Sequence, residues 1–427
     1  MEEASRRLSD RVPETAARIT FVVGAGGAGK STVAAALAVD AHRAGRRVLL
    51  ASIDGADPSD LVSDVALEVR RIDPLAVLES QYRLLTTALA MSGGHDHGGG
   101  PTLPDPEELT SLPGGEPLTA LLEVVRCADS GEWDEVIVDC PGPLSWREIV
   151  ATPGAVAGYV ERIWPRHARV VASTGQDVRA AVLVELVDRV VAAATSVTAV
   201  LEDDRRTSAV VVARPSARSF ATARELLAVT SFHGVRVDRV VAAGVIPDLG
   251  AGAPSSVLGT HPGVFWMDRA HAEHRAALEE FRGAVGDLRV DVVSAQPTEP
   301  VGSTALGAVA ADLNGQPAAG HGGAALAALS PRVRHESGHG LDSVYVMDVP
   351  LPFVDTDSVA VGRVEDDVIV SAQGSRRRLR LASVLRRCVV TGAGVDDGVL
   401  SVTFAPDPAL WPENLQKADA PGESGDG

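Results

Sequence analysis

One short segment, GAGGAGKST at positions 24–32, most constrains what this chain can fold into. The segment follows an apolar run and matches the pattern GxxxxGK[ST]. Its glycines let backbone N–H groups converge on phosphate oxygens without steric conflict from Cβ atoms. A helix that begins near Lys30 would point the positive end of its dipole at the same place. The segment therefore predicts a strand–loop–helix unit that binds the phosphates of a nucleotide.

The loop supplies most of the expected nucleotide-binding residues. We expect ATP to be bound by Gly26, Gly27, Ala28, Gly29, Lys30, Ser31 and Thr32. Lys30 would place a point charge at the outer phosphates, Ser31 would offer its hydroxyl to Mg²⁺, and Thr32 would contact the inner phosphates. The alternative is a glycine-rich turn with a chance lysine, and the strand–loop–helix context disfavours it.

Two aspartates follow or end other predicted strands. Asp54 comes after RRVLLASI (46–53), and Asp139 ends DEVIVD (134–139). Because ligands gather at the carboxyl ends of the strands in a doubly wound sheet, we expect both carboxylates near the loop. Asp139 would hold Mg²⁺ through water, and Asp54 would be the catalytic residue that orients or deprotonates the attacking water. For each aspartate, a solvated turn or a helix cap is the alternative.

Short Val-rich runs recur between stretches that can form helices. Seven runs are strand candidates: 18–23, 46–53, 134–139, 168–173, 208–213, 238–246 and 289–294. They are nearly continuous in apolar residues, which is typical of strands buried on both faces of a parallel sheet. The sequence therefore predicts an α/β fold over residues 16–315, with a doubly wound, mostly parallel sheet of the P-loop NTPase type.

The pattern changes in the last quarter of the chain. Residues 341–407 contain short runs that alternate apolar and polar residues between turns, which predicts a small all-β sandwich. Residues 316–340 are rich in Ala, Gly and His and predict a linker. The polar, acidic segment 408–427 is expected to be disordered, and residues 1–15 to form a flexible N-terminus.

Composition excludes several classes of partner. The formal net charge is −18, which argues against nucleic acid as the main partner. Three widely spaced cysteines without a CxxC pair fit a reducing cytoplasm and give no zinc or disulfide framework. No run of about 18 apolar residues occurs, so no integral membrane segment is expected. The N-terminus also lacks a secretory signal, and the sequence predicts a cytoplasmic protein.

Beyond the loop, the chain resembles the ArsA family, which includes the arsenite-pump ATPase subunit and the factor that targets tail-anchored membrane proteins. The matching segments are SID (52–54), IDPLAVLESQY (72–82), LPGGEPLTALLEVVR (112–126), DCPGPLSWREIVATP (139–153), DDRRTSAVVVARP (203–215) and EPVGSTAL (299–306). The β region resembles the α-crystallin-like, small-heat-shock type domain that is fused to some bacterial members. The resemblance implies a deviant Walker A loop of the SIMIBI type and a Mg-ATP-dependent, face-to-face dimer that responds to a partner or client protein.

Four residues depart from the family's pattern. The signature lysine, which in the family reaches across the dimer to the partner's nucleotide, is Ala25 here. Leu144 replaces a glycine of the switch segment, Ala243 an asparagine beside the adenine, and Gly55 a proline. A lost cation facing a developing phosphoryl charge removes electrostatic stabilisation. Nucleotide binding is therefore expected, whereas hydrolysis and base specificity stay open.

Three functions are compatible with these features. The first is an ATP-dependent switch that works as a homodimer and couples nucleotide state to a client. The second is a non-catalytic or weakly active subunit of a heterodimer, whose partner is a paralogous ArsA-like ATPase with an intact loop. The third is a holdase-like protein that captures extended peptides on its β sandwich. Metalloid binding is disfavoured, because the cysteines do not match a metalloid-binding trio.

Overall fold

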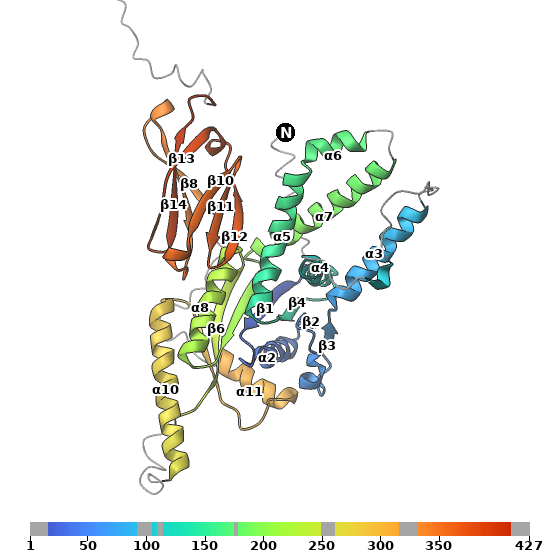
Figure 1. Cartoon of the computed structure of the whole chain (residues 1–427). Coiled ribbons are helices and arrows are strands. Elements are labelled where there is room, and N and C mark those ends of the chain that lie inside the picture. Colours follow the sequence, from blue (N-terminus) through green and yellow to red (C-terminus); the bar gives the residue numbers. More distant parts are fainter. Residues whose placement is uncertain are drawn as a thin grey trace, which may run out of the picture.

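The computed structural model of the chain describes residues 16–91, 105–108, 114–174, 178–248, 261–315 and 331–410. Within these ranges an α/β unit is followed by an all-β unit (Figure 1). Residues 1–15, most of the predicted linker and most of the acidic tail lie outside the described residues.

The α/β unit is built on a seven-stranded sheet in which every strand is parallel to its neighbours, in the order β3-β2-β4-β1-β5-β6-β7. The strands are β1 Arg18–Gly24, β2 Val48–Ser52, β3 Glu68–Arg71, β4 Glu135–Asp139, β5 Thr207–Ala213, β6 Arg236–Val245 and β7 Val290–Ser294. All residues of β2 and β5 are buried, as their continuous apolar sequence predicts. The order places β1, which leads into the GAGGAGKST loop, near the middle of the sheet.

Helices cover both faces of this sheet (Figure 1). On one face lie α2 (Lys30–Arg43) and α11 (Gly302–Asn314), which pack in one hydrophobic cluster with Val22, Leu50 and Ile137. The helices α4 Gly115–Asp129, α5 Pro143–Ile163, α7 Val178–Glu202, α8 Ala217–Phe232 and α10 Pro262–Val285 contribute to a larger cluster on the other face. The described residues also form α3 (Pro74–Met91) and α6 (Arg166–Ser173).

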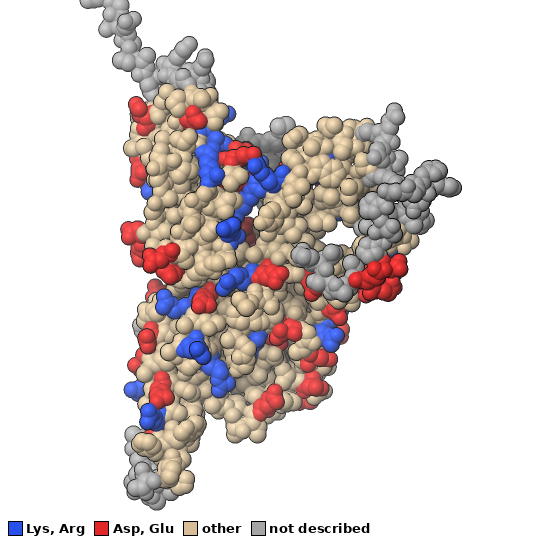
Figure 2. All heavy atoms as spheres, viewed as in Figure 1, with Lys and Arg blue, Asp and Glu red and all other residues tan. Residues whose placement is uncertain are grey.

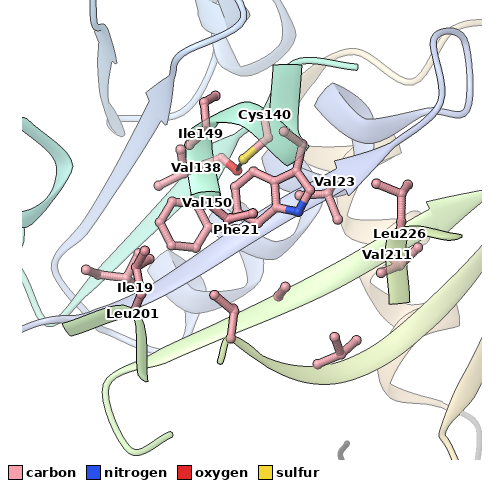
Figure 3. Close-up of a cluster of buried hydrophobic side chains, with 14 of the residues drawn as sticks. Ile19, Phe21, Val23, Val138, Cys140, Ile149, Val150, Leu201, Val211 and Leu226 are labelled. Atoms are coloured by element: carbon pink, nitrogen blue, oxygen red, sulfur yellow. Dashed lines mark hydrogen bonds between the residues drawn. The ribbon is translucent and has the colours of Figure 1, made fainter. Parts of the chain in front are cut away.

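The larger cluster joins helix α5 to the central strand β1. Phe21 of β1 and Trp146 of α5 are both buried, and their ring centroids are 5.2 Å apart. Figure 3 shows Phe21 among Val138, Ile149 and Val150, from the neighbouring strand and from α5. Aromatic pairs at this separation add about 0.5–1.5 kcal/mol beyond the apolar area that they bury. Helix α5 is therefore anchored to the strand that carries the loop.

One predicted strand is wrong. Residues 168–173 belong to helix α6, which begins after Pro165 and leaves Val170 and Val171 exposed. Arg169 is buried in this helix, and its guanidinium bonds to Asp188 of α7, a tertiary contact that the local apolar pattern does not specify. The sequence also missed β3, a four-residue edge strand, EVRR, that has no continuous apolar run to reveal it.

The second unit contains two antiparallel sheets, as an all-β sandwich requires. One has the order β13-β14-β9-β8 and the other β10-β11-β12. The strands are β8 Arg332–Ser337, β9 Val344–Pro350, β10 Ala360–Val364, β11 Asp367–Ala372, β12 Ser375–Arg380, β13 Cys388–Asp396 and β14 Val399–Pro406. Side chains from both sheets share one core. Strand β8 falls inside the segment predicted as a linker, so part of that segment pairs with β9.

The two units share side-chain contacts. Phe232, the last residue of α8, is buried in the core of the sandwich. Arg377 Nη1 of β12 donates to the Phe232 carbonyl at 2.6 Å, and Arg378 Nη1 donates to the Gly158 carbonyl of α5 at 2.9 Å. No helix among the described residues is long and apolar enough to cross a membrane.

Candidate nucleotide-binding site

The GAGGAGKST loop connects the end of β1 to the start of α2, as the sequence predicts. A Cβ atom on Gly24 would lie 2.4 Å from the Val212 carbonyl oxygen of β5, so only glycine fits beside that strand. Gly27 and Gly29 have φ angles of 70° and 97°, in the left-handed region that glycine adopts without steric cost. The loop therefore depends on glycine for two different reasons, close approach and backbone conformation.

Lys30 is the first residue of α2 and is 7% exposed. Lys30 and Lys417 are the only lysines in a chain that has 39 basic residues, and the others are arginines. A lysine ammonium is a compact point charge on a flexible stem, whereas a guanidinium is a planar fork. The retained lysine therefore fits a role at phosphate oxygens, where a phosphate-binding loop uses a point charge.

Ser31 and Asp139 meet beside Lys30. The Ser31 hydroxyl donates a hydrogen bond to Asp139 Oδ2 at 2.6 Å. Asp139 ends β4 and is fully buried, and its Oδ1 has no hydrogen-bond partner among the described residues. Burial raises the pKa of the Asp139 carboxyl, the Ser31 hydrogen bond and the Lys30 charge oppose the rise, and the Asp54 charge adds to it. A buried carboxylate with a free oxygen beside a hydroxyl suits a hard cation such as Mg²⁺.

Asp54 lies near Asp139 but not at the end of its strand. Strand β2 ends at Ser52, which pairs with Asp139, and the Ile53 N–H donates to the Asp139 carbonyl at 3.1 Å. Asp54 is exposed and lines a cavity of about 450 Å³ with residues of α4 and α5, including Glu116 and Glu148. Its carboxylate is thus open to solvent at the carboxyl edge of the sheet, where an attacking water could reach it.

The structure also places three of the four residues that depart from the family's pattern, namely Gly55, Leu144 and Ala243. Gly55 has a φ of 76°, which a proline cannot adopt, so the loop after Asp54 requires a residue other than proline. Leu144, in the first turn of α5, is 77% exposed. Ala243 is buried, and a Cβ atom on Gly29 would lie 3.6 Å from the Ala243 methyl group. Ala243 thus packs beneath the phosphate loop.

Two histidines that the sequence did not single out hold the end of β6. The Ile246 N–H donates to His274 Nδ1 at 3.2 Å, and His271 Nδ1 lies 2.8 Å from the Ile246 carbonyl, to which it donates. Both come from α10, in the sequence HAEH, whose spacing puts them on one face of the helix. Burial, followed by the Arg214 charge, lowers the pKa of His274 and favours its neutral form. These two hydrogen bonds form a clamp on Ile246 that fixes the segment following β6. This segment lies at the same carboxyl edge of the sheet as Asp139.

The parallel sheet, the glycine loop and the Ser31–Asp139 pair define the P-loop NTPase fold of the doubly wound class. Comparison with known families identifies the family within this class. Residues 17–315 match the model of the anion-transporting ATPase family, ArsA, and residues 342–404 match the HSP20-like domain found in ArsA. The chain belongs to the ArsA ATPase family, and its β unit is the HSP20-like domain.

Similar proteins occur in several bacteria. The chain is 34% identical to Protein Rv2184c of Mycobacterium tuberculosis over 429 residues, which cover 95% of this chain and all of that protein. It is 29% identical to the protein SCO2128 of Streptomyces coelicolor over 418 residues, which cover 92% of this chain and 99% of the relative. A shorter match, 28% identical over 168 residues, covers 34% of this chain and 41% of a putative arsenical pump-driving ATPase of Aquifex aeolicus.

Proposed function

We propose that this chain binds Mg-ATP in the 24–32 loop and works as a dimeric switch that couples nucleotide state to a partner protein. The hydrogen bond between Ser31 and Asp139 carries the proposal, because it brings together two groups that suit magnesium, next to the buried ammonium of Lys30. When bound, Mg²⁺ would neutralise negative charge on the phosphates.

Each residue of the site has a separate task in this proposal. The backbone of Gly26–Gly29 binds phosphate oxygens, Lys30 contributes its charge, and Thr32 contacts the inner phosphates. Ser31 and Asp139 hold the metal. Asp54 orients the attacking water, because its exposed carboxylate lies at the same edge of the sheet as the fully buried Asp139. All of the residues with these tasks lie within the part of the chain that the structure describes.

The proposal includes a dimer. The charge missing at position 25 of this chain must then come from the second subunit. Ala25 is partly exposed in the loop, and its methyl group cannot stabilise charge that develops on a partner's nucleotide. A homodimer would therefore hydrolyse ATP slowly. A paralogous subunit with lysine in that position would supply the missing charge to this chain's nucleotide, in a heterodimer.

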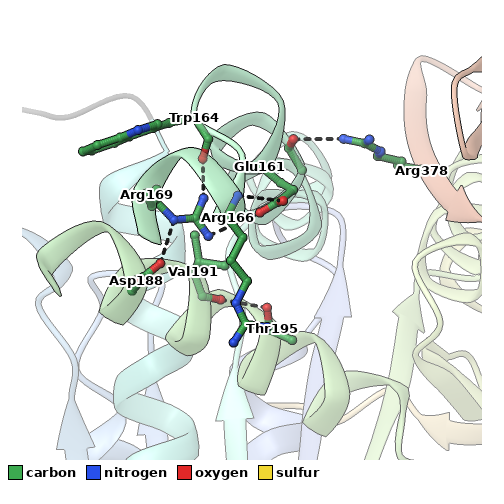
Figure 4. Close-up of polar contacts among 9 residues, drawn as sticks. Glu161, Trp164, Arg166, Arg169, Asp188, Val191, Thr195 and Arg378 are labelled. Carbon is green, nitrogen blue, oxygen red and sulfur yellow. Dashed lines mark hydrogen bonds and ion pairs between the residues drawn. The ribbon is translucent and has the colours of Figure 1, made fainter. Parts of the chain in front are cut away.

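The helices α5, α6 and α7 form an arm that offers a binding surface for the partner protein. Tyr159 and Ile163 of α5, Val171 of α6 and Leu183 of α7 are between 51% and 81% exposed. The buried Arg169 fixes the arm by bonding to the Trp164 carbonyl, to Asp188 and to Glu161 (Figure 4). Exposed apolar side chains on these three helices favour a protein-binding surface. Helix α5 also starts four residues after Asp139. A structural change at the bound nucleotide would therefore be transmitted to this arm through one helix.

Nucleotide titration tests the proposal. We expect a fluorescent ATP analogue to bind with a micromolar or lower dissociation constant in Mg²⁺, and at least tenfold more weakly when EDTA removes the metal. Lys30→Ala should abolish binding, whereas the matched variant Lys417→Ala, which changes the other lysine, should bind as the original chain does. Absence of saturable binding at micromolar protein, or equal binding by both variants, would refute the proposal.

A second candidate function is capture of extended peptides by the HSP20-like domain. Strand β8 is at the end of its sheet, pairs only with β9, and has all six of its residues exposed. Such an edge can add a further strand by backbone hydrogen bonding. Removing residues 331–427 should then abolish suppression of client aggregation while nucleotide binding persists. Equal suppression by the truncated and the full chain would exclude this function.

A further inference from the structure

A second cavity lies where the HSP20-like domain meets the helices of the ATPase domain. Its volume is about 340 Å³, and its lining comes from α5, α7, the end of α8 and the three-stranded sheet. Small-molecule sites are concave, often lie between domains, and usually have volumes of about 300–1,000 Å³. Nothing in the proposed nucleotide site uses this cavity, which is lined by none of the loop residues.

Four of the seven α5 residues that line the cavity are small. Ala151, Gly154, Ala155 and Gly158 recur at helical spacing, and Ile369 of the sheet lines the same cavity. These four residues leave room between the helix and the sheet, although Tyr159 and Arg162 of α5 line the cavity as well. Arg378 and Gly158 both line the cavity, and a Cβ atom on Gly158 would lie 3.4 Å from Arg378 Cδ, so the glycine leaves space for the arginine side chain.

Basic side chains gather along this boundary (Figure 2). Three of the four arginines that line the cavity are paired with acidic residues: Arg162 with Glu365, Arg377 with Glu202, and Arg378 with Asp367. The fourth, Arg376, is exposed, and its guanidinium has no ion pair or hydrogen bond among the described residues. The lining therefore keeps one uncompensated positive charge in a chain whose net charge is −18.

A buried histidine adds an unsatisfied polar group. His233 lines the cavity, is 8% exposed, and has no hydrogen-bond partner for Nε2 among the described residues. Burial and the Arg377 charge lower the pKa of His233 to about 3, so the imidazole is neutral at pH 7. Leaving a buried polar atom unpaired costs about 1–3 kcal/mol, and most such atoms in proteins have a partner. A polar atom of a ligand would give Nε2 that partner.

We infer that this cavity binds a small anionic amphiphile, with an acidic head group at Arg376 and an apolar body between α5 and the three-stranded sheet. The charge of Arg376 selects an anion, and the small-residue wall with Ile369 selects an apolar body. His233 provides a neutral hydrogen-bonding group to the bound molecule. This inference does not rest on nucleotide binding, because the two sites share no lining residue.

Calorimetric titration of the full chain with decanoate, without nucleotide, tests the site. We expect one equivalent to bind. Acetate, which has the head without the body, and decyltrimethylammonium, which has the body with the opposite charge, should each bind at least tenfold more weakly. Arg376→Glu should weaken decanoate binding at least tenfold. Arg380→Glu, an exposed arginine of the same strand that does not line the cavity, should change it less than twofold.

A second pair of variants tests the apolar body independently of charge. Ala155→Trp should fill the cavity and abolish decanoate binding, whereas Ala155→Ser should preserve it, and thermal unfolding will show that both variants are folded. The inference is overturned if decanoate does not bind to the original chain, if the cationic amphiphile binds equally well, or if binding survives both Arg376→Glu and Ala155→Trp.

Discussion

Trp146 of helix α5 donates a hydrogen bond from Nε1 to the Thr230 hydroxyl of α8 at 3.0 Å, and both residues are fully buried. The bond ties the helix that follows Asp139 to the helix whose last residue enters the core of the HSP20-like domain. Because buried polar groups need partners, this pair fixes α5 in one position within an otherwise apolar core.

Trp146→Phe should lower the free energy of unfolding by roughly 2–3 kcal/mol, since it leaves the Thr230 hydroxyl unpaired and a small cavity beside Phe21. Urea unfolding followed by circular dichroism measures the change. Trp266→Phe, on an exposed face of α10, is the matched control and should stay within about 0.5 kcal/mol of the original chain. Equal losses for the two variants would mean that the buried bond contributes nothing.

Asp139→Asn should stabilise the ligand-free chain and weaken its binding of Mg-ATP at least tenfold. Burial raises the pKa of this carboxyl, so the folded chain binds the proton more tightly than the unfolded chain does. The stability contributed by Asp139 is therefore present at low pH and lost as pH rises through the raised pKa. A neutral amide avoids that loss at pH 7. Thermal unfolding without and with Mg-ATP separates the two effects, and a lower melting temperature without ligand would contradict the argument.

Asp54→Asn should reduce ATP turnover by about 10²-fold or more and change nucleotide affinity less than threefold, because the carboxylate acts on water rather than on the phosphates. Phosphate release and fluorescent-nucleotide titration measure the two quantities on the same preparation. The exposed Asp60, which lies in the short 3₁₀ helix that follows, supplies the control Asp60→Asn. Unchanged turnover in Asp54→Asn would assign the water to another residue.

Ala25→Lys should raise ATP turnover of the chain alone at least tenfold. The new ammonium would stabilise the developing phosphoryl charge in a dimer, where a comparable arginine contributes about 10³–10⁵-fold. Ala25→Met has a side chain of similar length without the charge and should leave turnover unchanged. If neither variant changes turnover while both bind nucleotide, the site is completed by a different subunit or is not catalytic.

His233 should make the chain sensitive to acid. Its pKa of about 3 in the folded chain lies below the usual 6.5, so the unfolded chain takes up the proton first. Stability is therefore complete above about pH 6.5 and falls as pH decreases toward 3, by about 2 kcal/mol between pH 7 and pH 5 from this group alone. His233→Phe should remove that part of the loss in urea titrations at the two pH values, whereas exchange of the exposed His335 for Gln should not.

Much of the fold could be predicted because the relevant signals are local. Continuous Val-rich runs identified six of the seven central strands, and GAGGAGKST located the loop between β1 and α2. The strand predictions failed where the local composition of the sequence was ambiguous. The run at 168–173 is apolar enough for a strand, but its conformation depends on the contact between Arg169 and Asp188, and the four residues of β3 are mostly polar.

The candidate site, like the fold, could be predicted only in part from the sequence. The positions of the loop residues and of Asp139 could be predicted from motif and strand ends, since a phosphate loop needs glycines and an acidic partner at a strand end, whereas their roles stay predictions. Asp54 was expected next to its strand and instead lies two residues beyond it. The clamp of His271 and His274 on Ile246 was not expected, because it joins segments 25 or more residues apart.

The sequence by itself determined the glycine loop between β1 and α2, the parallel sheet and the family, because strand burial, glycine geometry and helix starts depend on neighbouring residues. Only the tertiary structure decided that Asp139 is buried with a free oxygen beside Ser31, that β8 joins the sandwich, and that Arg376 and His233 line one cavity. The physical reason is that burial, electrostatic environment and cavities arise from packing between distant segments, which no local pattern specifies.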